Sequence, residues 1–299
     1  MHITGKRFWF LRISGAIILI GIIALLVFGL KPGVEFSSGS ILTISFEEEV
    51  KQSELETAMA ELGYANSIIQ RTGGGDFIIR TQELSGEERM GLEDALSFRF
   101  GTATEREFYS VSPMVATETA RNAIIAVGVA AVFILGYITW AFRRMPKPFH
   151  YGVCAIIALV HDVVLVLGIF AILGAIMDWE INLMFITGVL AVIGYSINNT
   201  VVVFDRIREN LKRGVSANFE VVVNNSLVET LSRSVNTSFT TMLVVLALLL
   251  FVGANIQNFA IVLLIGIIIG TYSSLFIAPN LLLVWEEGRW SGVLRQVPD

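Results

Sequence analysis

The sequence predicts an α-helical polytopic membrane protein with six transmembrane helices and one extracytoplasmic domain of the ferredoxin-like α+β type. Three observations lead to this fold class. Hydrophobic residues make up 54% of the chain and charged residues only 16%, with a mean hydropathy of +0.70, which exceeds the usual values for soluble domains. Apolar stretches close to the ~20 residues that a helix needs to cross a bilayer recur along the chain. Only one polar segment, residues 35–118, is long enough to form a domain.

Hydropathy predicts spans over residues 13–30, 120–142, 151–176, 183–204, 233–252 and 259–285. We therefore expect three parts: residues 1–34, with a cytoplasmic N-terminus and the first span; residues 35–118, the external domain; and residues 119–299, the other five spans with a cytoplasmic C-terminus. A cleaved signal peptide is the alternative for the first span. Residues 28–32 lack a small-x-small cleavage site, which favours an anchor.

The distribution of basic residues predicts the orientation, because Lys and Arg in short loops resist translocation. The loops near Asp178 and Asn255 contain neither residue, which places them and the polar domain outside. Basic residues gather before the first span, between the second and third, and after the fourth: Lys6, Arg7, Arg12, Arg143, Arg144, Lys147, Arg206, Arg208, Lys212 and Arg213. These segments, and both termini, should be cytoplasmic.

The external domain shows the pattern β-α-β-β-α-β, with predicted strands at residues 40–46, 67–71, 77–81 and 104–111. The helices are expected to begin at Ser53 and Ser85, since each serine precedes a glutamate by three residues and forms a capping-box pattern. Three glycines within residues 72–76 suit a hairpin turn that needs positive φ. Phosphate binding there is disfavoured, because no helix begins directly after them. This order predicts one sheet with two helices on a face.

Polar side chains inside the fourth span need an explanation, because unpaired donors and acceptors are costly in lipid. Asn198 and Asn199 interrupt an apolar stretch and point to a transport path or a helix contact. Asp205, Arg206 and Arg208 end the same span, and we expect them to form ion pairs at the cytoplasmic boundary.

Asp162 lies about 11 residues into the third span, which at ~1.5 Å per residue puts it near the middle of the bilayer. A carboxylate there is protonated, paired or part of a conduction path, and we favour a functional role. Because adjacent helical side chains point about 100° apart, His161 is not expected to contact Asp162 directly. Arg233 either lines the path or extends to lipid headgroups, and both interpretations stay open.

The remaining polar and sulfur-containing residues have simpler interpretations. Residues 216–231 combine an apolar side with a polar side and predict an interfacial helix, with a plain connector as the alternative. Cys154 has no disulfide partner within the chain and is expected to pack as a small apolar residue. The polar residues that follow Arg233 are expected to pack against the fourth span: Asn236, Thr237, Ser238, Thr240 and Thr241.

The stretch Gly-Tyr-Ser-Ile-Asn-Asn-Thr-Val-Val-Val-Phe-Asp-Arg-Ile-Arg-Glu-Asn at residues 194–210 resembles the signature of the SecF family. SecF is the smaller of the paired SecD–SecF subunits that assist bacterial Sec protein export. Ala-Leu-Val-His-Asp at 158–162 and Thr-Leu-Ser-Arg-Ser-Val-Asn-Thr-Ser at 230–238 fall in the expected order, and shorter, imperfect motifs flank the external domain at 33–39 and 111–113. The resemblance covers essentially the whole chain and implies membership of the resistance-nodulation-division superfamily.

One departure from the family pattern concerns the ion path. The family usually shows Asn-Asp-Thr where this chain has Asn198-Asn199-Thr200, and its Asp faces an arginine that corresponds to Arg233. An amide cannot take up or release a proton. Three explanations remain open: an engineered substitution, a natural variant that is coupled differently, or a partner subunit that carries the titrating group.

The residues show no nucleotide-binding loop, no metal-spaced His/Cys cluster and no nucleophile with a base, so neither an enzyme nor a cofactor is expected. Nothing in the net charge of -5 suggests nucleic acid. The resemblance implies an ion-driven subunit in the bacterial inner membrane. Its implied partners are a SecD-like subunit, a SecYEG-type translocon, unfolded exported polypeptide and membrane lipids. A small-molecule or lipid transporter of the same superfamily and a passive translocon scaffold are the alternatives.

Overall fold

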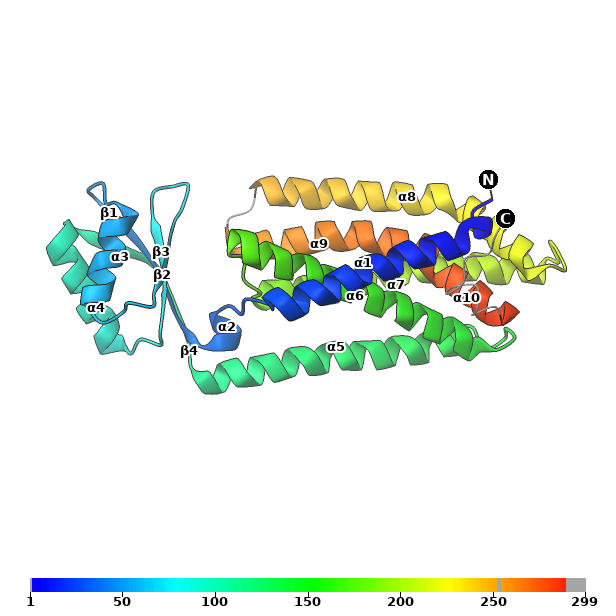
Figure 1. Cartoon of the computed structure of the whole chain (residues 1–299), viewed down its shortest axis with the longest axis horizontal. Coiled ribbons are helices and arrows are strands. Elements are labelled where there is room, and N and C mark those ends of the chain that lie inside the picture. The colour runs from blue at the N-terminus through cyan, green and yellow to red at the C-terminus, as the bar shows by residue number, and fades with distance from the viewer. Residues whose placement is uncertain (1, 252–253, 289–299) are drawn as a thin grey trace. The chain divides into compact units, whose positions relative to one another are not determined.

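The computed structural model describes residues 2–251 and 254–288 and is mostly helical (Figure 1). Its contacts separate two compact units. The residues up to Lys31, together with those from Ile125 onward, form a helical unit, and Pro32–Ile124 form a smaller α/β unit.

The helical unit contains six helices that are long and apolar enough to cross a membrane, which confirms the predicted number of spans within the described residues. The sixth candidate span joins α9 and α10 through a short π-helical turn, Ser273–Ile277. The helices are α1 (Arg7–Phe28), α5 (Pro113–Ala141, which begins in the smaller unit), α6 (Pro148–Met177), α7 (Leu183–Lys212), α8 (Phe219–Phe251), α9 (Ala254–Tyr272) and α10 (Ala278–Glu287).

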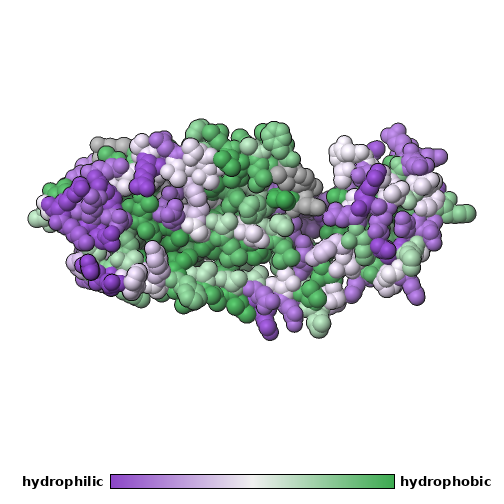
Figure 2. Space-filling view, turned by 180° about the vertical axis from the view of Figure 1, so that it is seen from behind, coloured by the Kyte–Doolittle hydropathy of each residue, from purple (hydrophilic) through white to green (hydrophobic). Residues whose placement is uncertain are grey.

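On the face that Figure 2 shows, the surface of the helical unit is apolar in the middle, and hydrophilic residues gather at one end. Large apolar side chains on α1 and α5 are exposed, as at Leu26 (81%) and Phe133 (73%). Exposed apolar side chains that gather in this way on spans of this length are typical of contact with lipid. Inside the unit, Cys154 of α6 is fully buried in the core, as expected for a small packing residue.

The interfacial helix predicted over residues 216–231 is wrong as a separate element, because residues 219–231 are the beginning of α8. No glycine or proline interrupts the chain between residues 219 and 251, so nothing ends the helix before the span. The apolar side of the segment does not face a lipid surface. Val223 and Leu227 are fully buried in the core of the helical unit.

The smaller unit has the predicted β-α-β-β-α-β order. Its antiparallel sheet runs β2-β3-β1-β4, so β1 and β3 are central and neighbouring, as in ferredoxin-like folds. Leu42 and Ile44 of β1 are fully buried against Leu55 of α3 and Leu96 of α4, which puts both helices on one face. The elements are α2 (Val34–Ser37), β1 (Gly39–Phe46), α3 (Gln52–Glu61), β2 (Ile68–Arg71), β3 (Phe77–Thr81), α4 (Gly86–Phe100) and β4 (Ala103–Val111).

Only one of the two predicted capping boxes forms. Ser85 accepts a hydrogen bond from Glu88 N at 3.3 Å and its own N–H donates to Glu88 Oε2 at 2.8 Å, which also lowers the pKa of the Glu88 carboxyl. The capping box predicted at Ser53 is wrong, because α3 already begins at Gln52. The Gln52 side chain donates to the Ile69 carbonyl of β2 at 2.9 Å. The glycine-rich segment forms the predicted hairpin between β2 and β3, with Gly75 at φ +95°.

Gly39 at the start of β1 provides a first testable prediction. Its φ is +129°, and an added Cβ would lie 2.6 Å from the Thr81 carbonyl oxygen of β3. Gly39→Ala should therefore lower the free energy of unfolding of the smaller unit by more than ~1 kcal/mol, measured by hydrogen exchange of the β1 and β3 amides in the full chain. Gly91→Ala is the matched control, since a Cβ at that helical position meets open space. Equal protection in the two variants would contradict this interpretation.

Candidate functional site

Asp162 is the centre of a buried polar cluster in the helical unit. It lies at the middle of the 30-residue α6 and is 1% exposed. Ser196 Oγ of α7 donates to Asp162 Oδ2 at 2.5 Å, and Ser273 Oγ of the π-helical turn donates to the same oxygen at 2.7 Å. Hydrogen bonds of this kind stabilise a carboxylate that is removed from water. The cluster therefore joins three separate helical segments at one ionisable group.

His161 does contact Asp162, contrary to the expectation from the sequence. Its Nδ1 lies 2.8 Å from Asp162 Oδ1, and its Nε2 contacts Ser14 Oγ of α1. The expectation considered only the directions of the two Cα–Cβ bonds. Nδ1 of an imidazole and an oxygen of an aspartate each lie two bonds beyond Cβ, so suitable rotamers bring them together despite that angle.

The turn that carries Ser273 is a structural feature that the sequence analysis missed. Residues Ser273–Ile277 form a π-helical turn between α9 and α10. Pro279 has no N–H to donate to the Leu275 carbonyl four residues earlier, and Asn280 Nδ2 donates to the next carbonyl, that of Phe276, at 2.7 Å. Single π turns inside α-helices are frequent at functional sites. A proline and paired serines within an apolar stretch were the available signal.

The two asparagines of α7 have different surroundings. Asn199 is 4% exposed, and its Nδ2 has no hydrogen-bond partner among the residues that the structure describes. It follows Ser196 by three positions and shares its helix face, which puts it one turn from the Asp162 cluster. Asn198 is exposed on the surface of the unit. Only Asn199 therefore belongs to the interior site.

Arg233 is not part of the buried cluster. Its side chain is exposed on α8 and forms no ion pair or hydrogen bond within residues 2–251 and 254–288. Tyr195 OH of α7 donates to Ser238 Oγ of α8 at 2.8 Å, so the two antiparallel helices bring Asn199 to about the level of Ser234. Arg233 is thus close to Asn199 along the bundle but points outward.

Most of the other polar residues of α8 form hydrogen bonds with the backbone of their own helix or with neighbouring helices. Ser238 accepts from Tyr195 and shares a hydrogen bond of 2.6 Å with Thr271 of α9, which ties three helices together. Thr237, Thr240 and Thr241 donate to backbone carbonyls of α8 itself. Ser238 therefore has the expected contact with the fourth span, whereas Asn236, Thr237 and Thr240 are exposed, so the predicted packing role is wrong for these three residues.

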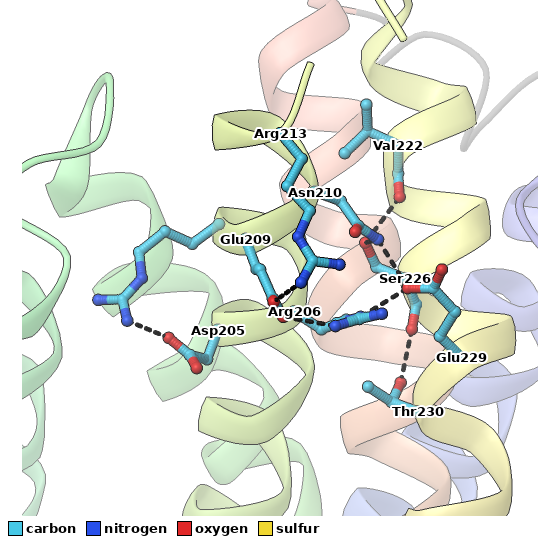
Figure 3. A network of polar contacts seen from close by, with 10 residues as sticks. Asp205, Arg206, Glu209, Asn210, Arg213, Val222, Ser226, Glu229 and Thr230 are labelled. Atoms are coloured by element: carbon cyan, nitrogen blue, oxygen red, sulfur yellow. Dashed lines mark hydrogen bonds and ion pairs between the residues drawn. The ribbon is translucent and has the colours of Figure 1, made fainter. Parts of the chain in front are cut away.

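The charged end of α7 forms the expected ion pairs and extends them to α8 (Figure 3). Asp205 pairs with Arg208, and Arg206 contacts Glu209 and Glu229 at 2.5 Å each. Asn210 Nδ2 donates to Glu229 Oε2 at 2.8 Å. The cluster therefore fixes the end of α7 to the first turns of α8.

A second charged contact at this end was not predicted. Arg7 is 6% exposed and pairs with Glu220 of α8 at 2.7 Å and with Glu287 of α10 at 3.1 Å. It thereby holds the beginnings of α1 and α8 against the end of α10. No pattern in the sequence indicates that this arginine is buried.

Comparison with known families decides the identity of this arrangement. The model for "Protein export membrane protein SecD/SecF, C-terminal" matches residues 93–288, and that for the "SecD/SecF GG Motif" matches residues 23–50. The chain belongs to the SecD/SecF family. Its similarity to family members named protein translocase subunit SecF extends over nearly the full length.

Two of these relatives match this chain at 40% identity or more. The protein of Thermobaculum terrenum is 43% identical over 308 residues, covering 99% of this chain and 97% of the relative. The protein of Anaerolinea thermophila is 40% identical over 294 residues, covering 97% of this chain and 96% of the relative.

Other relatives are longer. SecDF of Bacillus subtilis is 33% identical over 287 residues, and the match covers 95% of this chain but 38% of SecDF. The crystal structure of SecDF, a translocon-associated membrane protein, from Thermus thermophilus has a TM-score of 0.84 at 31% identity, over 96% of this chain and 39% of that one. The chain thus spans about two fifths of the SecDF proteins and nearly all of the SecF relatives.

Proposed function

We propose that this chain is an auxiliary subunit of the bacterial Sec translocase that, with a SecD-like subunit, uses an ion gradient to promote late steps of protein export. The full-length similarity to SecF proteins supports the translocase role. The observation that carries the ion-driven part is a buried carboxylate, Asp162, at the middle of a membrane span. Intramembrane carboxylates of this kind commonly mark proton or ion paths.

The energy available from such a path is sufficient. One unit charge that crosses a ~100 mV potential releases about 2.3 kcal/mol, enough to shift the balance between conformations that differ by a few kcal/mol. In this proposal Asp162 binds the ion, and Asn199, one turn from the cluster, lines the path without titrating. The conformational change would reach the exported, unfolded polypeptide through the smaller unit.

The exposed polar residues of the spans support a partner subunit. Asn198 of α7 and Arg233 and Asn236 of α8 are exposed, although each lies within a helix that can cross the membrane. Such side chains are unfavourable against lipid tails and favourable against another protein. The longer SecDF relatives contain a segment similar to this chain together with additional sequence. A SecD-like subunit therefore fits this face, and a SecYEG-type translocon fits as the larger assembly in the inner membrane.

The proposed partner subunit leads to a direct prediction. Purification in mild detergent should yield a one-to-one complex of this chain and a SecD-like subunit. Asn236→Trp should break the complex by placing a bulky group in the interface, whereas Val132→Trp, on the exposed surface of α5, should leave it intact. Size-exclusion chromatography with light scattering measures both. A stable monomer that conducts ions would contradict the proposal and favour a transporter that works alone.

A further inference from the structure

Ser14 and His161 form a continuous polar connection between the first span and Asp162. All three residues are almost fully buried, at 3%, 4% and 1% exposure. Ser14 Oγ contacts His161 Nε2, and His161 Nδ1 lies 2.8 Å from Asp162 Oδ1. The proposed ion path assigns roles to Asp162 and Asn199 but not to Ser14 or His161, so these two residues require their own explanation.

The helix that carries Ser14 is closely attached to α6. An added Cβ at Gly168 of α6 would lie 2.6 Å from Gly21 Cα, so the two backbones touch at this point. Beyond the end of α1, Ile181 N donates to the Lys31 carbonyl at 2.8 Å, and the Lys31 side chain pairs with Asp178. The chain continues from Lys31 directly into the smaller unit. A change at the middle of α6 therefore has a physical route to the segment that leads outward.

The two oxygens of Asp162 have different surroundings. Oδ2 accepts from both Ser196 and Ser273, which leaves Oδ1 to exchange a proton with His161. A neutral imidazole carries one N–H and one acceptor nitrogen, and its two nitrogens exchange these roles when a proton enters at one and leaves at the other. His161 is thus built into the position of a proton shuttle.

We propose that His161 and Ser14 are positioning residues for proton binding at Asp162, and that they couple its protonation to α1. This inference rests on the proposed function. When Asp162 is ionised, His161 Nδ1–H donates to Oδ1 and the Ser14 hydroxyl donates to Nε2. On proton uptake, one proton binds at Nε2 and the Nδ1 proton passes to Oδ1. The cluster gains one proton, and the Nε2–H now donates to Ser14 Oγ. The hydrogen bond between α1 and α6 thereby reverses its direction.

The groups that reach the pair from the neighbouring helices are hydroxyls. Within the described residues, Ser14 of α1, Ser196 of α7 and Ser273 of the π-helical turn contact it. Other ionisable groups on the elements packed against α6 have contacts elsewhere or are exposed. On α1, Arg7 pairs with Glu220 and Glu287, and Arg12 is exposed. Tyr195 of α7 donates to Ser238, and Tyr272 of α9 donates to the Phe10 carbonyl. Glu286 of α10 pairs with Lys147 and His150, and the charged cluster at the end of α7 contains Asp205, Arg206 and Glu209.

An infrared titration of the lipid-reconstituted complex with its SecD-like partner tests the inference. The C=O band of protonated Asp162 is identified by its loss in Asp162→Asn. Ser14→Ala should move the pH midpoint of that band by about half a pH unit or more, because the hydroxyl donates to Nε2 in one protonation state and accepts from it in the other, and these two hydrogen bonds differ in strength. Ser274→Ala is the matched control: this buried hydroxyl donates to the Thr271 carbonyl and not to Asp162, so the midpoint should stay in place.

A second variant separates coupling from local packing. His161→Asn keeps an N–H near Asp162 but is too short to contact Ser14. Combining it with Ser14→Ala should give no shift beyond that of His161→Asn alone, since both changes break the same connection. Two results would overturn the inference while leaving Asp162 as the proton site: an Asp162 band midpoint in Ser14→Ala equal to that of the wild type, or a shift in the double variant equal to the sum of the two single shifts. The absence of any Asp162-dependent band in the wild type would instead overturn the ion-binding part of the proposed function.

Discussion

Replacing Asp162 with asparagine is expected to reduce export to the level of cells that lack this chain. The change scarcely alters the volume of the side chain, so the packing around α6 should persist. Ser196 and Ser273 can still donate to the amide oxygen, but an amide cannot bind a proton. A pulse-chase secretion assay measures the effect, and immunoblotting of this chain and its partner confirms equal subunit levels.

The matched control for Asp162→Asn is Asp94→Asn. Asp94 is an exposed aspartate on α4 of the smaller unit, outside the buried cluster, so the same chemical change should leave export unaltered there. Wild-type secretion by Asp162→Asn at normal subunit levels would mean that the carboxylate only holds α6, α7 and the π-helical turn together.

Asn199→Asp is expected to raise proton-dependent export, because it introduces a titratable group one turn from the Asp162 cluster. The buried position makes an unpaired charge unfavourable by several kcal/mol. The new carboxylate should therefore draw the exposed guanidinium of Arg233 inward when it is ionised and release it when it takes up a proton. The pair adds a group that can titrate at the level of the fourth span. The measurement is export at several values of the transmembrane pH gradient.

A double change tests the pairing in this second prediction. Arg233→Leu in the Asn199→Asp background should abolish the gain, whereas Arg121→Leu, which removes an exposed arginine near the start of α5, should preserve it. If Asn199→Asp changes neither export nor ion flux, the coupling path lies in the partner subunit or elsewhere in this chain, and position 199 has no role in it.

The sequence predicted those features that depend on composition and local pattern. Six apolar stretches predicted six spans, and the local patterns within residues 35–118 predicted the β-α-β-β-α-β order of the smaller unit. A carboxylate within an apolar stretch was enough to identify Asp162 as a candidate. These signals work because lipid and core burial act on each segment separately.

Features that depend on side-chain rotamers or on neighbouring helices were not predictable. The contact between His161 and Asp162 requires particular rotamers, and the exposure of Arg233 depends on how α8 is rotated against α7. The π-helical turn places Ser273 on Asp162 by a backbone irregularity that leaves little trace in composition. The Ser53 capping box failed because a tertiary contact of Gln52 accompanies an earlier helix start.

Proton flux through the reconstituted complex tests the central claim most directly. Vesicles that contain this chain, its SecD-like partner and an internal pH-sensitive dye would be given a membrane potential, negative inside, and acidification would be followed over time. The account predicts acidification with the wild-type complex and none beyond the rate of empty vesicles with Asp162→Asn. Equal flux in the two complexes, or no flux in the wild type, would contradict it.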